Sequence, residues 1–177
     1  MIGAGDAALL GWLAANRQPW LDALMLGVTW LGSLWLLLPA AGLFTLLWRQ
    51  SGLRTLGALM TASVLCHLLK VLIDRPRPDL WPSLFPLPVD AAFPSAHSAQ
   101  AMAVAVALCY LLPASRRMRV GGGLILLAGL VGLSRLYLQV HWPSDVVFGW
   151  LLGAGVAIVS LRLAKAWRLD RARQSSS

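Results

Sequence analysis

Charged residues are scarce in this chain, and so is cysteine. Only 12% of its 177 residues are Asp, Glu, Lys or Arg, whereas 58% are hydrophobic. A soluble domain carries roughly 25% charged residues, so the polar surface here is too small to cover a globule in water. The two cysteines, Cys66 and Cys109, both lie inside apolar stretches rather than in loops, which argues against a disulfide framework.

A secretory signal peptide is not predicted either, because residues 1–15 contain Asp6, lack a basic start and have no clear cleavage site. Long uncharged blocks are present instead. Residues 25–48 form one such block, long enough to cross a hydrocarbon core of ~30 Å. We therefore predict an all-α, polytopic membrane protein, with one domain over residues 1–170 and a disordered tail over 171–177.

Five transmembrane helices are predicted, at about 22–48, 53–74, 95–113, 120–140 and 144–166. The preceding stretch 4–16 is too short and too polar to span, and predicts an amphipathic helix on the membrane surface. Six prolines within 75–94 indicate a loop. The third and fourth helices reach full length only if they include His97 and Arg135. Because ionisable groups at membrane depth are costly unless they line a polar cavity, we expect these ends to share a pocket.

The net charge of +8 is not spread over the chain. Basic residues gather at 49–54, at 115–119 and in the tail from 162, whereas most acids lie at the opposite ends of the predicted helices. This bias predicts that the basic turns are cytoplasmic. The loop 75–94, the turn 135–145 and the N-terminus then lie on the outer side. Charges that flank membrane helices argue against nucleic acid as a partner.

Three polar clusters lie at the outer ends of the predicted helices. They are Lys70 with Arg77 and Pro78, then Pro94-Ser95-Ala96-His97, and then Ser134-Arg135 with His141 and Asp145. Together they provide three cations, two imidazoles, a carboxylate and a serine hydroxyl. Cations for phosphoryl oxygens, a nucleophile and a proton donor are the groups that phosphoryl transfer requires.

The three clusters resemble the signatures of the type-2 phosphatidic acid phosphatase family, whose superfamily includes vanadium haloperoxidases and glucose-6-phosphatase. The family pattern is Lys-x6-Arg-Pro, then Pro-Ser-Gly-His, then Ser-Arg-x5-His-x3-Asp. This chain matches it in order and spacing over 70–145, and the helical layout extends the likeness to about 20–166. Ala96 replaces the usual Gly. We predict that Ser95 is a helix N-cap and Ala96 the first helical residue, where Ala carries no strain.

The resemblance implies a metal-independent lipid phosphatase with no cofactor, acting through a phospho-histidine. It makes His141 the nucleophile, Asp145 the carboxylate that orients it, and His97 the proton donor to the leaving group. The phosphate-binding groups that it implies are Lys70, Arg77, Ser95, Ala96 and Arg135, the alanine through its N–H at a helix start.

The expected substrates are undecaprenyl diphosphate, phosphatidylglycerophosphate or phosphatidate. The expected location is a bacterial inner membrane with the site on the periplasmic side. A lipid phosphotransferase using the same histidine, and a non-catalytic transporter or scaffold, remain as alternatives, and no oligomeric state is indicated.

Single residues also have simpler interpretations. Lys70 suits a snorkelling residue at the end of a span, and Asp145 suits a first-turn carboxylate. His97, His141 and Asp145 are possible zinc ligands, but three nearby cations would repel a divalent ion and favour a phosphate. Asp74 and Arg75 are expected to be structural, as a surface pair.

Overall fold

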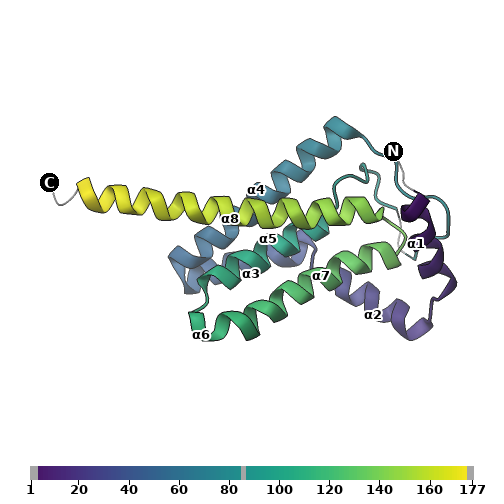
Figure 1. Ribbon diagram of the computed structural model, residues 1–177, viewed down its shortest axis with the longest axis horizontal. Coiled ribbons are helices and arrows are strands. Elements are labelled where there is room, and N and C mark those ends of the chain that lie inside the picture. Colours follow the sequence, from purple (N-terminus) through teal and green to yellow (C-terminus); the bar gives the residue numbers. More distant parts are fainter. Residues whose placement is uncertain (1–3, 85–86, 175–177) are drawn as a thin grey trace.

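The computed structural model describes residues 4–84 and 87–174, and every regular element in these ranges is a helix, as predicted (Figure 1). The elements in chain order are α1 (Ala4–Ala15), α2 (Pro19–Trp30), α3 (Leu34–Leu47), α4 (Arg49–Ile73), α5 (Ala96–Leu111), α6 (Ala114–Arg116), the π-helical turn η1 (Arg117–Gly121), α7 (Gly122–Tyr137) and α8 (Pro143–Gln174).

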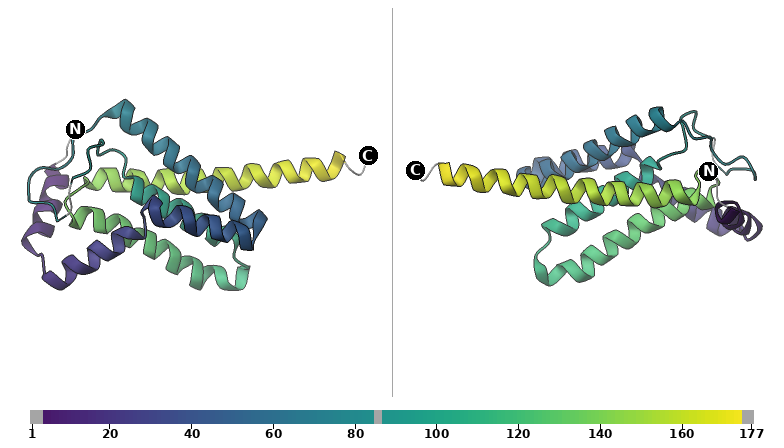
Figure 2. Two further views of the ribbon diagram at one scale, coloured as in Figure 1. Left: turned by 180° about the vertical axis from the view of Figure 1, so that it is seen from behind. Right: turned by 45° about the horizontal axis from the view of Figure 1, so that its top comes forward.

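Helix α5 forms the centre of the bundle, where it packs against α4, α7 and α8. Helix α8 runs beside α5 and extends beyond the bundle toward the C-terminus, as Figures 1 and 2 show. Helix α1 crosses the opposite end, next to the turn between α7 and α8, and the loop after α4 folds over the same end. The polar clusters of the sequence therefore meet at one end of the bundle.

Small residues allow α5 and α8 to approach each other closely. A Cβ added at Gly149 of α8 would lie 2.7 Å from the carbonyl oxygen of Ser95. At Gly153, one turn further, a Cβ would overlap the carbonyl oxygen of Ala99 and lie 3.0 Å from the nitrogen of Ala103. The GxxxG spacing of the two glycines thus places backbone against backbone.

The single helix predicted over 22–48 is wrong, because the chain breaks there into α2 and α3, whose axes are bent by 47°. Gly32 lies in the break, where a Cβ would come within 3.0 Å of the carbonyl oxygen of His97. Ser33 then caps α3, its Oγ accepting a hydrogen bond from Trp35 N at 3.3 Å. The break thus allows the chain to pass directly against the first turn of α5.

Other helix ends also differ from the prediction. The gap predicted between the helices at 22–48 and 53–74 lies inside α4, which begins at Arg49. A Cβ at Gly52 would lie 2.5 Å from Thr45 N of α3, so this glycine serves a close helix contact and not a turn. In the predicted tail, residues 171–174 belong to α8, and residues 175–177 lie outside the described ranges.

Three described helical stretches have the length and apolar composition to cross a membrane: Arg49–Ile73, Ala114–Tyr137 and Pro143–Trp167. The bent pair α2–α3 would make a fourth. Helix α5 has only 16 residues, fewer than the ~20 of a free-standing span. Helix α1 is present as predicted, with Leu10 buried in the bundle. Its placement on the membrane surface, like the count of five crossings, stays a prediction.

We expect Gly153→Ala to lower the melting temperature of the protein in detergent, because its Cβ would overlap the backbone of α5. Overpacking of this kind costs about 1–3 kcal/mol. Gly155→Ala is the matched control, since a Cβ there meets nothing within 4 Å. Thermal unfolding of both variants measures the difference, and equal melting temperatures would contradict the close α5–α8 contact.

Candidate active site

A cavity of about 230 Å³ lies where the helix ends and the loop after α4 converge. Six of the eight predicted site residues line it: Lys70, Arg77, Ala96, His97, Arg135 and His141. The other two, Ser95 and Asp145, are fully buried behind this lining. The structure thus brings together three sequence clusters that are separated by up to 75 positions.

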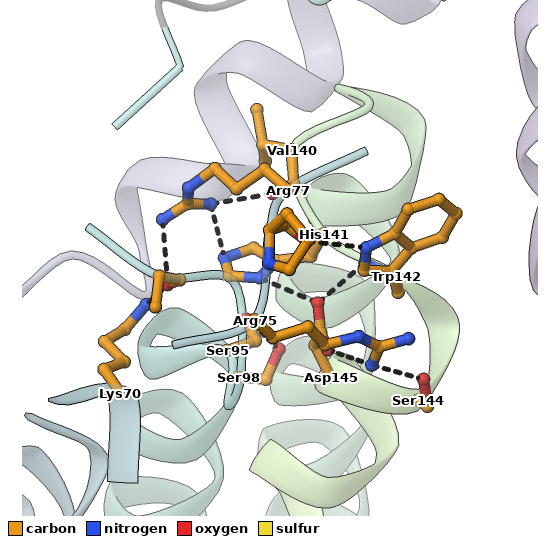
Figure 3. Close-up of polar contacts among 12 residues, drawn as sticks. Lys70, Arg75, Arg77, Ser95, Ser98, Val140, His141, Trp142, Ser144 and Asp145 are labelled. Atoms are coloured by element: carbon orange, nitrogen blue, oxygen red, sulfur yellow. Dashed lines mark hydrogen bonds and ion pairs between the residues drawn. The ribbon is translucent and has the colours of Figure 1, made fainter. Parts of the chain in front are cut away.

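His141 and Asp145 lie side by side at the start of α8 (Figure 3). Pro143 is the first residue of that helix, as its fixed φ favours. His141 is 2% exposed, and its Nδ1 lies 3.5 Å from Asp145 Oδ2, which accepts a hydrogen bond from Trp142 N at 2.9 Å. At 3.5 Å the pair is in contact but is longer than an ordinary hydrogen bond. Such contacts between functional groups commonly shorten when substrate binds.

Arg75 binds the other carboxylate oxygen of Asp145. Its Nη1 donates to Asp145 Oδ1 at 2.6 Å, and its Nη2 lies 3.5 Å from Asp6 Oδ2 of α1. The predicted surface pair of Arg75 with Asp74 is therefore wrong. Asp74 instead caps α4 in a left-handed conformation, with φ of 42°. No local pattern indicated the true partner of Arg75, because that partner lies 70 positions away.

Three cations face the cavity: Lys70 and Arg135 are buried, and Arg77 is partly buried. Arg77 Nη1 lies 3.3 Å from His141 Nε2 and donates to the carbonyl oxygen of Val140 at 2.7 Å. Arg135 is 2% exposed and donates from Nη1 to Thr29 Oγ1 at 2.6 Å. Its Nε has no hydrogen-bond partner within the described residues. Burying cations is costly unless an anion pairs with them, so this arrangement favours an anionic partner.

Asp90, which the sequence analysis did not select, already pairs with two of these cations. Its carboxylate lies 3.0 Å from Lys70 Nζ and 2.6 Å from Arg77 Nη2. Burial by itself raises the pKa of Asp90, but the hydrogen bonds and charges of Lys70 and Arg77 hold the pKa below its ordinary value. The carboxylate is therefore ionised at neutral pH. It occupies two donors that a phosphoryl group would use.

The start of α5 is as predicted, with Ser95 at the N-cap and Ala96 as the first helical residue. Ser95 N donates to the carbonyl oxygen of Asp145 at 3.1 Å, and Ser98 Oγ donates to Ser95 Oγ at 2.9 Å. Among the described residues, only Asp74 and Gln139 are non-glycine residues with positive φ. Ala96 therefore replaces Gly without strain, and its N–H remains among the N–H groups of the helix start, where the helix dipole favours an anion.

The surroundings of His141 favour a neutral imidazole. Burial, followed by the positive charges of Arg135, Arg77 and Lys70, lowers the pKa of His141 well below its ordinary value. The ring then remains unprotonated, with a lone pair available, as the pH falls into the acidic range. Within residues 4–84 and 87–174, no three His, Cys, Asp or Glu side chains converge as metal ligands would.

The model of the PAP2 superfamily matches residues 51–169 of the chain. Phosphatidylglycerophosphatase B of Bacillus subtilis is 34% identical, and the alignment covers 86% of this chain and 79% of that protein. Undecaprenyl-diphosphatase of Sulfolobus acidocaldarius is 30% identical, with 90% and 78% covered.

Two solved structures have the same fold. One is the PAP2-type phosphatidylglycerolphosphate phosphatase of Bacillus subtilis, with a TM-score of 0.83 and 32% identity over 92% of this chain and 86% of that chain. The other is LpxE of Aquifex aeolicus, with a TM-score of 0.80 and 29% identity over 92% and 99%. The likeness thus covers the helical bundle as well as the site.

Asp90 forms ion pairs with Lys70 and Arg77 and so competes with an anionic ligand for them. We therefore expect Asp90→Asn to bind orthovanadate or inorganic phosphate about tenfold more tightly, equivalent to about 1.4 kcal/mol. Asp79→Asn is the control, since it makes the same charge change at an exposed position of the same loop. Isothermal titration in detergent measures both constants. Weaker binding by Asp90→Asn would instead make Asp90 a support that holds Lys70 and Arg77 in place.

Proposed function

Because the chain belongs to the PAP2 superfamily, we propose that it is a metal-independent membrane phosphatase that hydrolyses a lipid phosphate or diphosphate through a phospho-histidine. One observation carries the proposal: His141, backed by Asp145, lines the same cavity as the cations Lys70, Arg77 and Arg135. A neutral imidazole facing a cationic cavity combines a nucleophile with a binding site for the phosphate that it attacks.

In the first step, His141 Nε2 attacks phosphorus and the bond between phosphorus and the leaving oxygen breaks. His97 gives its proton to that oxygen, and Asp145 stabilises the imidazolium that forms. The three cations and the N–H groups at the start of α5 stabilise the charge on the equatorial oxygens. In the second step, water attacks the phospho-histidine, His97 accepts a proton from the water, and the bond between nitrogen and phosphorus breaks.

We propose five membrane crossings, with the bent pair α2–α3 as one and α5 as another. Helix α5 is short, but α4, α7 and α8 surround it, so it does not need to match the bilayer by itself. Arg49, Arg116 and Arg117 lie at the end away from the site and mark the cytoplasmic side. The cavity then faces the periplasmic side of a bacterial inner membrane, and α1 lies on the outer surface.

Undecaprenyl diphosphate, phosphatidylglycerophosphate and phosphatidate are the candidate substrates, because each places a phosphate at the membrane surface with its tail in the bilayer. A phosphotransferase would form the same intermediate on His141 and pass the phosphoryl group to an alcohol. Phosphate release with water as the only acceptor distinguishes the two reactions.

We expect His141→Ala to reduce phosphate release by roughly 10⁴-fold or more. Wild type, His97→Ala and His141→Ala are incubated with a radiolabelled aryl phosphate and quenched in alkaline denaturant, in which phospho-histidine survives. Wild type should retain label, and His97→Ala should accumulate more because its second step is slow. The nucleophile assignment would be wrong if a monodisperse His141→Ala variant were labelled.

The orientation predicts which loops a membrane-impermeant maleimide reaches in intact cells. Leu80→Cys and Met118→Cys are each placed in a background with Cys66→Ala and Cys109→Ala. Both positions are exposed, by 50% at Leu80 and 87% at Met118. Leu80→Cys should label directly, and Met118→Cys only after the membrane is permeabilised. The reverse pattern would overturn the proposed orientation.

A further inference from the structure

A second and larger cavity, of about 400 Å³, adjoins the active-site cavity between α3, α4 and α5. The two cavities have five lining residues in common: Leu34, Lys70, Asp90, Ala96 and Gln100. They therefore meet at Lys70, whose side chain lines both. A molecule whose phosphate lies in the first cavity can extend into the second.

From Lys70, the second cavity follows α4 back toward the middle of the bundle as far as Ser63. With a rise of 1.5 Å per residue, this is a depth of about 10 Å along the helix. Val64 and Leu68 border the cavity and are each about half exposed, by 52% and 51%. Because α4 is one of the candidate membrane spans, this side of the cavity faces the bilayer.

Besides Lys70 and Asp90, three further polar side chains line this membrane-embedded cavity, namely Ser63, His67 and Gln100. Gln100 is 6% exposed and donates from Nε2 to Ser63 Oγ at 3.1 Å, while Ser63 Oγ donates to the carbonyl oxygen of Leu59 at 2.8 Å. The serine thus orients the amide. His67 makes no hydrogen bond to the described residues. Polar groups at membrane depth that face a cavity are expected to serve a ligand.

The free donors suit carbonyl oxygens. One N–H of Gln100 is used by Ser63, so the second is available, and the imidazole of His67 carries a ring N–H in either tautomer. Gln100 lies one turn along α5 from His97, on neighbouring positions of the helix surface. When the leaving oxygen of a lipid lies at His97, the part of the lipid bonded to that oxygen therefore lies next to Gln100.

We propose that this second cavity binds the ester-linked glycerol of a diacylglycerol-type phosphate, with His67 and Gln100 donating to its ester carbonyl oxygens. In such a lipid the ester groups follow the phosphate after a few bonds. In a polyprenyl phosphate, hydrocarbon follows at once and would leave both donors unsatisfied. The cavity therefore selects glycerophospholipid phosphomonoesters over polyprenyl phosphates. The proposal rests on the proposed function, because the phosphate of the same molecule must lie beside His141.

The test compares kcat/KM for dioleoyl phosphatidate, its dioleyl ether analogue, geranylgeranyl phosphate and an aryl phosphate. Wild type should prefer the ester over the ether analogue by about a hundredfold, about tenfold for each of the two hydrogen bonds. In His67→Leu and in Gln100→Leu, this ratio should fall about tenfold, and in the double variant it should fall to about one. Leu72→Ala, at a 77% exposed position on α4 outside the cavity, should keep the ratio of the wild type.

The outcomes separate the two proposals. Failure of wild type to release phosphate from any substrate, the aryl phosphate included, would overturn the proposed function. Equal wild-type values for ester and ether lipids would overturn only the glycerol site, and so would a ratio that survives in both variants. Because the ratio in wild type is itself decisive, the test does not depend on the folding of Gln100→Leu.

Discussion

The contact between the backbones of α5 and α8 is the constraint on which the site depends. Helix α5 carries His97, and α8 begins two residues after His141. Neither helix alone forms a site. Gly149 and Gly153 bring the two axes close enough for Ser95 N to donate to the carbonyl oxygen of Asp145 at 3.1 Å. This hydrogen bond joins the start of α5 directly to the start of α8. The separation of the two histidines is therefore set by rigid helices and not by flexible loops.

Electrostatics imposes the second constraint, because three cations lie around one cavity with few anions beside them. Asp90, in the loop after α4, forms ion pairs with Lys70 and Arg77. The hydroxyl of Thr29 accepts one hydrogen bond from Arg135. Asp145 is held by Arg75 on one oxygen and lies beside His141 on the other. Positive charge that is only partly compensated lowers the cost of bringing a phosphate out of water.

Much of the site could be predicted from the sequence, because spacing within a helix or a tight turn fixes local geometry. The N-cap predicted at Ser95 is one example, and the helix predicted from about residue 144, which begins at Pro143, is another. Features that depend on distant contacts could not be predicted. The break around Gly32 follows from its contact with His97, and the pairing of Arg75 with Asp145 depends on how α4 and α8 are placed. Asp90 lies in a loop whose sequence carries no pattern for its position.

The residues that complete the site extend well outside the part of the chain that carries the family signatures. The superfamily match begins at residue 51, yet Thr29 holds Arg135 and Asp6 lies beside Arg75. Gln139, in the turn before His141, donates to the carbonyl oxygen of Leu10 in α1. A fragment cut at the family boundary would keep every signature residue, but Arg135 would lose its hydroxyl partner and Arg75 one of its two carboxylates. The first fifty residues thus help to hold the charged side chains of the site in place. The signature residues alone, transferred to another scaffold, would lack these contacts.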